Sequence, residues 1–148
     1  MNDLIYDRTI ADVVRLTSKG YYNASDLNRV EEWTGYIKDR FNELGYTTDG
    51  YKAKEGSASW DKLDIPTTVE LERIRNNITI LRSIIALNKS VPSVPTTLNF
   101  LDYIKANDIE KILFYLDNHI KWMKSYFVKA GVGRAGQGRM LQNRFRRY

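Results

Sequence analysis

A glycine-rich stretch, residues 131–136, has the spacing of a dinucleotide-binding loop. It reads Gly-Val-Gly-Arg-Ala-Gly. In a dinucleotide-binding protein such glycines follow a strand and let the backbone approach a pyrophosphate. Here the stretch follows a helical apolar pattern, and no acidic residue comes after it to bind a ribose. We therefore expect no bound cofactor, and we interpret the four glycines within residues 131–138 as a flexible linker.

His119 is the only histidine, and the chain contains no cysteine. One histidine cannot form a multi-histidine metal site, and a thiolate metal site or a thiol–imidazole pair requires cysteine. Because no candidate nucleophile with motif support lies near His119, we favour a structural histidine. We expect no metal site and no catalytic residues, and hence a protein that is not an enzyme.

Charged residues of both signs share the region 29–43 at spacings of three and four. Such spacing is typical of a solvent-facing helix surface with ion pairs between successive turns. We interpret these residues as a solvated surface rather than as paired catalytic carboxylates. They are Glu31, Glu32, Asp39 and Glu43, with Arg29, Lys38 and Arg40.

Three aromatic residues, Tyr46, Tyr51 and Trp60, flank or lie within a polar, non-periodic stretch. Together they could stack on a sugar, or they could pack on the core with their polar atoms in water. We favour packing, so a carbohydrate-recognition module is the weakest of the functions considered.

Residues 131–148 contain five arginines and no acidic residue. The chain has 23 basic and 18 acidic residues, so residues 1–130 hold 18 of each and are electrically neutral. Arginine mixed with apolar residues favours docking on another protein, but it could also bind nucleic acid or remain a solvated end. The residues that we predict to contact a partner are Arg134, Arg139, Met140, Leu141, Arg144, Phe145, Arg146, Arg147 and Tyr148.

The elements that position these residues are predicted to be helices, because apolar residues recur every three or four positions. A short first helix is capped by Asp7 or Thr9, and a longer second helix is capped by Asn23 or Ser25. Glycine at positions 20 and 45 is suited to end them. The expected buried side chains are Ile10, Val13, Val14 and Leu16 in the first helix, and Leu27, Val30, Trp33, Ile37, Phe41 and Leu44 in the second.

Residues 46–66 are predicted to be a long connection, with Trp60, Leu63 and Ile65 holding its far end to the core. A third helix then begins with a capping box between Thr67 and Glu70. In the second helix, glycine at position 35 would cost ~1 kcal/mol against alanine. A glycine kept at that cost indicates that a neighbouring element packs closely against it. The expected face of the third helix contains Val69, Ile74, Ile78, Leu81 and Ile85, with Leu71 and Ile84 beside it.

The last long helix is predicted to begin at Asn107, with Glu110 in its first turn, and to end at Gly131. A short helix around residues 98–106 would precede it. No alternating pattern indicates a strand. We therefore predict an all-α protein: a bundle of three long helices and one or two short ones over residues 1–130, and an extended basic tail over residues 131–148.

Two sequences near the N-terminus resemble a known helical module. They are DRTIADV (residues 7–13) and GYYNASDLNRVEEWTGYI (residues 20–37). Trp60, Pro66 and Thr67, followed by RIRNNITIL at residues 73–81, resemble the module's second part. The resemblance, over about residues 7–127, is to tail and baseplate proteins of phages and prophages of Gram-positive bacteria.

The resemblance implies an attachment or assembly role, and it carries no catalytic residue to this chain. In such proteins the module is often joined to a receptor-binding or fibre region, which this sequence does not show, so the resemblance leaves open whether the chain binds a host receptor. We expect a structural protein of the phage tail, baseplate or neck, made in the host cytoplasm and located in the virion. Its expected partners are other virion proteins and copies of itself, with no membrane. The alternative is a small nucleic-acid-binding accessory protein that uses the arginine-rich tail.

Overall fold

The computed structural model is all-α, as predicted, with no strand in residues 1–56 and 59–145, whose backbone it describes. Side chains are described as far as Tyr126, without those of residues 57–58. The helices are α1 (Ile10–Val14), α2 (Ala24–Glu43), α3 (Thr68–Ser83) and α4 (Tyr103–Phe145). The chain forms two compact units, Met1–Asp117 and Asn118–Tyr148, and α4 contains the boundary between them.

α1 begins at Thr9, one of the two predicted caps, but its apolar residues are not buried. Thr9 and Asp12 form a capping box, in which each side chain accepts a hydrogen bond from the backbone N–H of the other. We expected Ile10, Val14 and Leu16 on a buried face, yet they are 60%, 73% and 65% exposed. A helix of five residues is too short to form an apolar stripe, and the segment before it makes the contacts with the bundle.

α2 follows its predicted pattern closely. Asn23 is the N-cap and forms a capping box with Asp26, and Gly45 follows the last turn with a φ of +85°. The close packing predicted at Gly35 is absent, because a Cβ there would lie 3.8 Å from Tyr51 Oη, an ordinary contact. The buried apolar side chains of α2 are Leu27, Val30, Ile37 and Phe41, while Trp33 and Leu44 are half-buried.

α3 begins with the predicted capping box, in which Thr67 and Glu70 satisfy each other's backbone N–H groups. Its buried apolar residues are Ile74, Ile78 and Leu81. Val69 was expected on this face but is 79% exposed, because it lies in the first turn at the end of the bundle. The half-buried residues are Leu71, Ile84 and Ile85.

α4 begins earlier and ends later than predicted. It starts at Tyr103 rather than Asn107, the Asp102 carboxylate accepts a hydrogen bond at 2.8 Å from the Lys105 N–H, and no separate helix precedes it. The backbone stays helical through residue 131 to Phe145, so the extended tail predicted from the glycines is wrong for residues 131–145. Each glycine costs a helix ~1 kcal/mol, but the intervening alanine, arginine, glutamine, methionine and leucine are strong helix formers.

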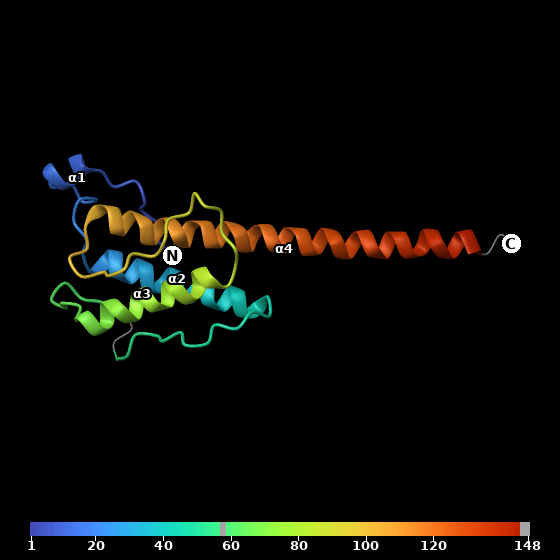
Figure 1. The fold of residues 1–148 in the computed structure, drawn as a ribbon, viewed down its shortest axis with the longest axis horizontal. Coiled ribbons are helices and arrows are strands. Elements are labelled where there is room, and N and C mark those ends of the chain that lie inside the picture. Colours follow the sequence, from blue (N-terminus) through green and yellow to red (C-terminus); the bar gives the residue numbers. More distant parts are fainter. Residues whose placement is uncertain (57–58, 146–148) are drawn as a thin grey trace. The chain divides into compact units, whose positions relative to one another are not determined.

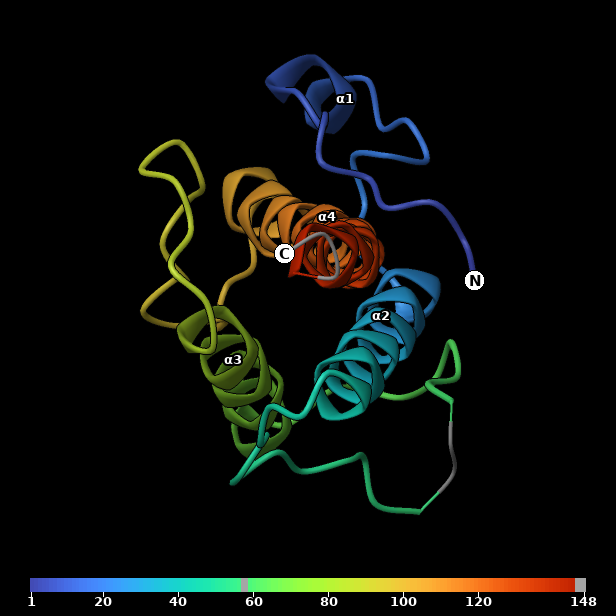
Figure 2. The same cartoon turned by 90° about the vertical axis from the view of Figure 1, so that its right-hand side faces the viewer.

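Within the first unit, α2, α3 and the part of α4 up to Asp117 run in the same direction (Figure 1). Figure 2, which views this unit along the helices, shows the three arranged as a triangle, with α1 outside it. Parallel neighbours cannot be joined by tight turns, because the chain must return along the helix before the next one begins. At ~1.5 Å per residue α2 is ~30 Å long, which explains the long connection predicted before α3.

The core contains apolar side chains from all three helices and from both connections. Burial of each large side chain contributes ~1.5–3 kcal/mol to stability, which makes this core the main source of the fold's free energy. Trp60, Val91 and Leu98 enter it from the connections. The side chains that α4 contributes up to Asp117 are Ala106, Ile109, Ile112, Leu113 and Leu116.

Candidate functional site

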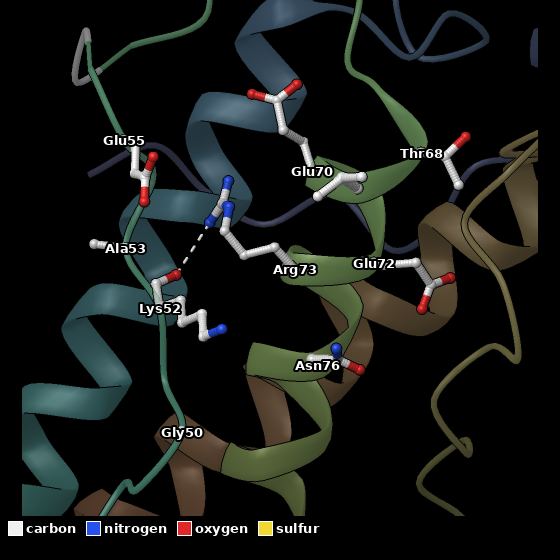
Figure 3. Close-up of a pocket in the computed structure, with 10 residues that line it drawn as sticks. Gly50, Lys52, Ala53, Glu55, Thr68, Glu70, Glu72, Arg73 and Asn76 are labelled. Carbon is white, nitrogen blue, oxygen red and sulfur yellow. Dashed lines mark hydrogen bonds between the residues drawn. The ribbon is translucent and has the colours of Figure 1, made fainter.

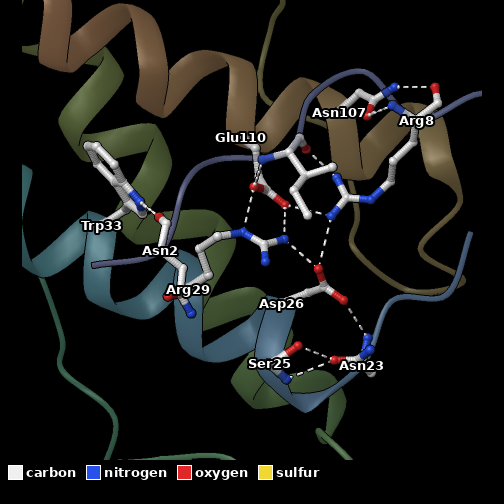
Figure 4. Close-up of polar contacts among 10 residues, drawn as sticks. Asn2, Arg8, Asn23, Ser25, Asp26, Arg29, Trp33, Asn107 and Glu110 are labelled. Carbon is white, nitrogen blue, oxygen red and sulfur yellow. Dashed lines mark hydrogen bonds and ion pairs between the residues drawn. The ribbon is translucent and has the colours of Figure 1, made fainter. Parts of the chain in front are cut away.

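Four charged side chains form a buried network where the N-terminal segment meets α2 and α4 (Figure 4). Arg8, Asp26, Arg29 and Glu110 are each no more than 5% exposed. Nε and Nη2 of Arg29 each donate to the Glu110 carboxylate at 2.8 Å. Arg8 Nη2 donates to Glu110 at 2.8 Å and to Asp26 at 3.0 Å, and Arg29 also donates to Asp26. Two guanidinium groups therefore face two carboxylates, and their charges cancel.

Further hydrogen bonds attach the N-terminal segment to α4. The Glu110 carboxylate accepts from the Ile5 N–H at 2.6 Å. The Asn107 side chain accepts from the Arg8 N–H at 3.0 Å and donates to the Arg8 carbonyl at 2.8 Å. The Arg8 guanidinium lies 5.5 Å from the ring centroid of Tyr22. Burial, with the negative charge of Glu110 nearby, raises the pKa of Tyr22.

The buried network fixes the fold and does not form a reaction centre. Charged groups removed from water are tolerated when each has a close partner of opposite charge, as each has here. Solvent reaches almost none of the four side chains, so a substrate has no access to them. Arg29 was predicted on a solvated surface; it is buried because Glu110 of α4 supplies its partner.

Two asparagine side chains hold the connection between α2 and α3 by binding its backbone. Asn28 donates to the Trp60 carbonyl at 2.9 Å and accepts from the Trp60 N–H at 2.5 Å. Asn77 binds Lys52 in the same way, at 2.8 and 2.9 Å. An asparagine amide can replace a backbone partner in this manner. The predicted role of Trp60 in holding the connection is confirmed, because this residue is only 5% exposed.

A hollow of about 570 Å³ lies between this connection and the first turns of α3 (Figure 3). Arg73 is its most prominent lining side chain, and it donates to Glu31 at 3.1 Å and to the Lys52 carbonyl at 3.2 Å. Glu31, which we predicted on a solvated surface, is therefore paired across two helices. Glu70 lines the hollow too, but it caps α3. Arg73 and Glu70, two of the charged side chains that line the hollow, are thus already bound within the chain.

The aromatic residues considered for sugar binding pack within the protein instead. Trp60 is buried and presents no open face. The ring of Tyr46 packs edge-on against Phe41 with centroids 5.8 Å apart. Tyr51 Oη lies 3.4 Å from Thr34 Oγ1, and burial raises the pKa of Tyr51. The packing interpretation is confirmed for Trp60 and Tyr51, while Tyr46 is 37% exposed, so the three rings do not form a shared exposed platform.

His119 is half-buried and packs against Trp122, with ring centroids 5.6 Å apart. Trp122 in turn stacks on Tyr126 at 5.5 Å. Among the described residues, no three His, Cys, Asp or Glu side chains are grouped so that they could hold a metal ion. Within the same residues no helix has the length and apolar character needed to cross a membrane.

The most unusual surface is at the end of the bundle where the three long helices begin. A hollow of about 750 Å³ lies there, lined by the residues before and at the start of each helix. Six large apolar or aromatic side chains of these segments are at least half exposed, and we call them the apolar end. They are Tyr21 (50%), Leu63 (90%), Ile65 (87%), Val69 (79%), Phe100 (96%) and Ile104 (54%).

Leu63 and Ile65 were predicted to pack on the core, and this prediction is wrong. Leu63 lies in a turn closed by hydrogen bonds between Asp61 and Asp64, which directs it to solvent. Ile65 precedes Pro66, and a proline favours an extended backbone in the residue before it. Ile65 therefore stays outside the helix that follows. The core is instead reached by Trp60 alone in this part of the connection.

Phe100 is both nearly fully exposed and held in a strained backbone conformation. Its φ is +53°, in the left-handed region that residues other than glycine and asparagine rarely adopt. Such a conformation costs roughly 1–3 kcal/mol. Packing within the chain does not repay this cost, because the ring is 96% exposed. A strained, exposed phenylalanine is a candidate for contact with another molecule.

The predicted partner-binding residues lie near the C-terminus. Residues 134–145 belong to α4, but their side chains fall outside the described ones. Arg146, Arg147 and Tyr148 fall outside the described residues altogether. The contacts predicted for this set therefore stay a prediction.

The sequence reading missed the buried network and the apolar end. A signal for the network was present: Asp26 and Arg29 lie three residues apart on one helix, and each directly precedes a buried apolar residue, Leu27 and Val30. A charged pair embedded in an apolar face indicates a buried ion pair rather than a solvated surface. No comparable signal identified the apolar end, because exposed and buried leucines look alike in a sequence.

Comparison with protein-family models, with curated proteins and with solved structures finds no match.

Proposed function

We propose that the chain is a structural protein of a phage virion, in the tail, baseplate or neck, which assembles in several copies. The observation that carries this proposal is the apolar end, where Leu63, Ile65 and Phe100 are at least 87% exposed. Exposed apolar groups gathered in one place are typical of a surface that another protein covers. The resemblance of residues 7–37 to tail and baseplate proteins supports the same class of function.

The apolar end is suited to contacts that are weak singly and strong in an assembly. Covering its six side chains would contribute at most roughly 9–18 kcal/mol, at about 1.5–3 kcal/mol each. Association costs roughly 4–15 kcal/mol in lost translational and rotational freedom. The two terms are comparable, so one such contact would be reversible. Several contacts made at once in a symmetric assembly would hold the chain in place.

Quantitative mass spectrometry of purified virus particles from the source tests this proposal. We expect a fixed copy number per particle, in keeping with ring or spike symmetry. Absence of the chain from the particles would refute the proposal.

A matched pair of variants links particle incorporation to the apolar end. Val69→Asp places a charge on that surface, and Val14→Asp places one on α1; the two valines are 79% and 73% exposed. An acidic residue in the first turn of α3 is favoured by the helix dipole, so Val69→Asp should fold normally. We expect Val69→Asp to lose incorporation and Val14→Asp to retain it. Equal incorporation of both would remove the apolar end from the assembly mechanism.

A further inference from the structure

We propose that the apolar end binds residues 134–148 of a second copy of this chain, so that copies join head to tail. This inference rests on the proposed assembly function and names one of its partners. The two surfaces of this contact, the apolar end and residues 134–148, are different parts of the chain. Contacts of this kind generate rings when the rotation between copies closes, and open filaments when it does not.

Charge complementarity supports this choice of partner. The segments of the apolar end, residues 21–25, 61–69 and 98–104, contain three acidic residues, Asp61, Asp64 and Asp102, all exposed. The only basic residue in these segments is Lys62. Lys105 lies next to them, but its ammonium group binds the Asn99 and Phe100 carbonyls. The end is therefore acidic as well as apolar.

Residues 134–148 have the opposite charge and the same apolar character. They contain five arginines and no acidic residue, together with Met140, Leu141, Phe145 and Tyr148. Arginine and aromatic residues are the types most favoured at the centre of protein interfaces. The rest of the chain is electrically neutral, so this segment carries the whole net charge of +5.

The hollow beside Phe100 gives the segment a place to bind. It is lined by apolar groups, such as Leu71, Leu98 and Leu101, and by Asp61 and Asp64. A large apolar side chain could fill the hollow while neighbouring arginines reach the two aspartates. The strained and exposed Phe100 at its rim would then be covered by the partner.

Two full-length variants separate the two halves of the contact. The first, Phe100→Asn with Leu63→Lys, disables the apolar end; asparagine tolerates the left-handed backbone, and Leu63 is 90% exposed. The second, Arg144→Glu with Arg146→Glu and Arg147→Glu, disables the C-terminal segment.

Leu16→Asn is the matched control for these variants. Leu16 also has a left-handed backbone, with φ of +55°, and is 65% exposed, but it lies at the end of α1. Far-UV circular dichroism should match the wild type and thermal unfolding should show no loss of stability in the first variant and the control, because the side chains replaced there are at least 65% exposed. The same two measurements establish that the arginine variant is folded.

Molar mass from light scattering, measured during gel filtration at low salt, reads out the contact. The wild type and the Leu16→Asn control should exceed the single-chain mass of 17.3 kDa, increasingly so at higher concentration. Each contact variant alone should give the single-chain mass. An equimolar mixture of the two should give twice 17.3 kDa, because one intact end of each chain then meets the intact end of the other. High salt should dissociate the mixture by screening the charges.

Several results would overturn the inference. They are a mixture that keeps the single-chain mass, contact variants that associate as the wild type does, and a wild type that is a single chain throughout. Loss of duplex DNA binding, rather than of self-association, in the arginine variant would assign the segment to nucleic acid instead. If the chain is present in particles but the mixture of the two variants keeps the single-chain mass, the head-to-tail contact is wrong and the virion function stands. Absence from particles would refute the function whatever the mixture does.

Discussion

Replacing Glu110 by glutamine should destabilise the protein strongly, although the two side chains have nearly the same shape. The Glu110 carboxylate is 0% exposed and accepts hydrogen bonds from Ile5, Arg8 and Arg29. In Glu110→Gln one oxygen becomes an NH₂ group, which faces donors that it cannot bind. The change also leaves two buried guanidinium groups against the single carboxylate of Asp26.

The expected loss follows from the cost of a buried charge without its partner. Breaking a buried ion pair by removing one member typically costs about 3–5 kcal/mol. Domains are stabilised by only ~5–15 kcal/mol in total. For a chain of this size 1 kcal/mol corresponds to ~2–4 °C, so the midpoint of thermal unfolding should fall by roughly 6–20 °C.

Unfolding by urea, followed by the fluorescence of the tryptophans, measures this loss. Urea is preferred to guanidinium chloride because it carries no charge that would screen the network. Glu72→Gln is the control: Glu72 pairs with Arg75 at 2.9 Å, but both side chains are partly exposed, so the cost should be under ~1 kcal/mol. Equal losses in the two variants would refute the assignment of the buried network as a stabilising element of the fold.

A double variant tests the physical cause. Glu110→Met with Arg29→Met removes one charge of each sign and leaves Arg8 paired with Asp26. If the loss in Glu110→Gln arises from an unpaired buried charge, the double variant should be more stable than the single one. A double variant that is less stable than Glu110→Gln would show that the hydrogen bonds, rather than the charge balance, are decisive.

Two glycine variants should change the stability in opposite directions, and a tyrosine variant should change its pH dependence. Gly35→Ala should raise the free energy of unfolding by up to ~1 kcal/mol, because alanine favours the helix and its Cβ would make only an ordinary contact with Tyr51. Gly20→Ala should lower it by roughly 1–3 kcal/mol, because its Cβ would lie 2.2 Å from the Asp12 carbonyl oxygen. Urea unfolding of both checks the pair, and a stabilising Gly20→Ala would contradict the packing described. Tyr22→Phe should reduce the loss of stability in alkaline solution. Because the folded-state pKa of Tyr22 is raised, stability is complete below its ordinary value of 10.0 and falls as the pH rises above it. An unchanged slope above pH 10.0 in the variant would refute this.

The helix starts that the sequence predicted correctly depend on local interactions. Thr9, Asn23 and Thr67 each cap a helix through a residue three positions later, and this spacing is visible in the sequence. The start of α4 was missed because Asn107 and Glu110 have the same spacing but bind distant parts of the chain. The spacing of a polar residue three positions before an acid is therefore not sufficient to identify a helix start.

The candidate site could not be predicted, because it depends on how the helices are arranged. The parallel course of α2 and α3 brings their starts to one end of the bundle, with the segment before α4. Leu63 and Phe100 belong to different connections, and the sequence does not show that both lie at this end. Their exposure and the positive φ of Phe100 are properties of the folded chain alone.

The residues on which the predicted resemblance to phage proteins rests have structural roles, so they specify a fold more directly than a function. Asp26 and Arg29 of the DLNR sequence join the buried network, and Asn28 holds the backbone of Trp60. Such residues specify how the module folds, since each is committed to another part of the same chain. Proteins that share them should share this scaffold and differ at the apolar end, where no residue is committed to the fold in this way. Variation at Leu63 and Phe100 among such proteins should therefore follow the partner, while the network stays unchanged.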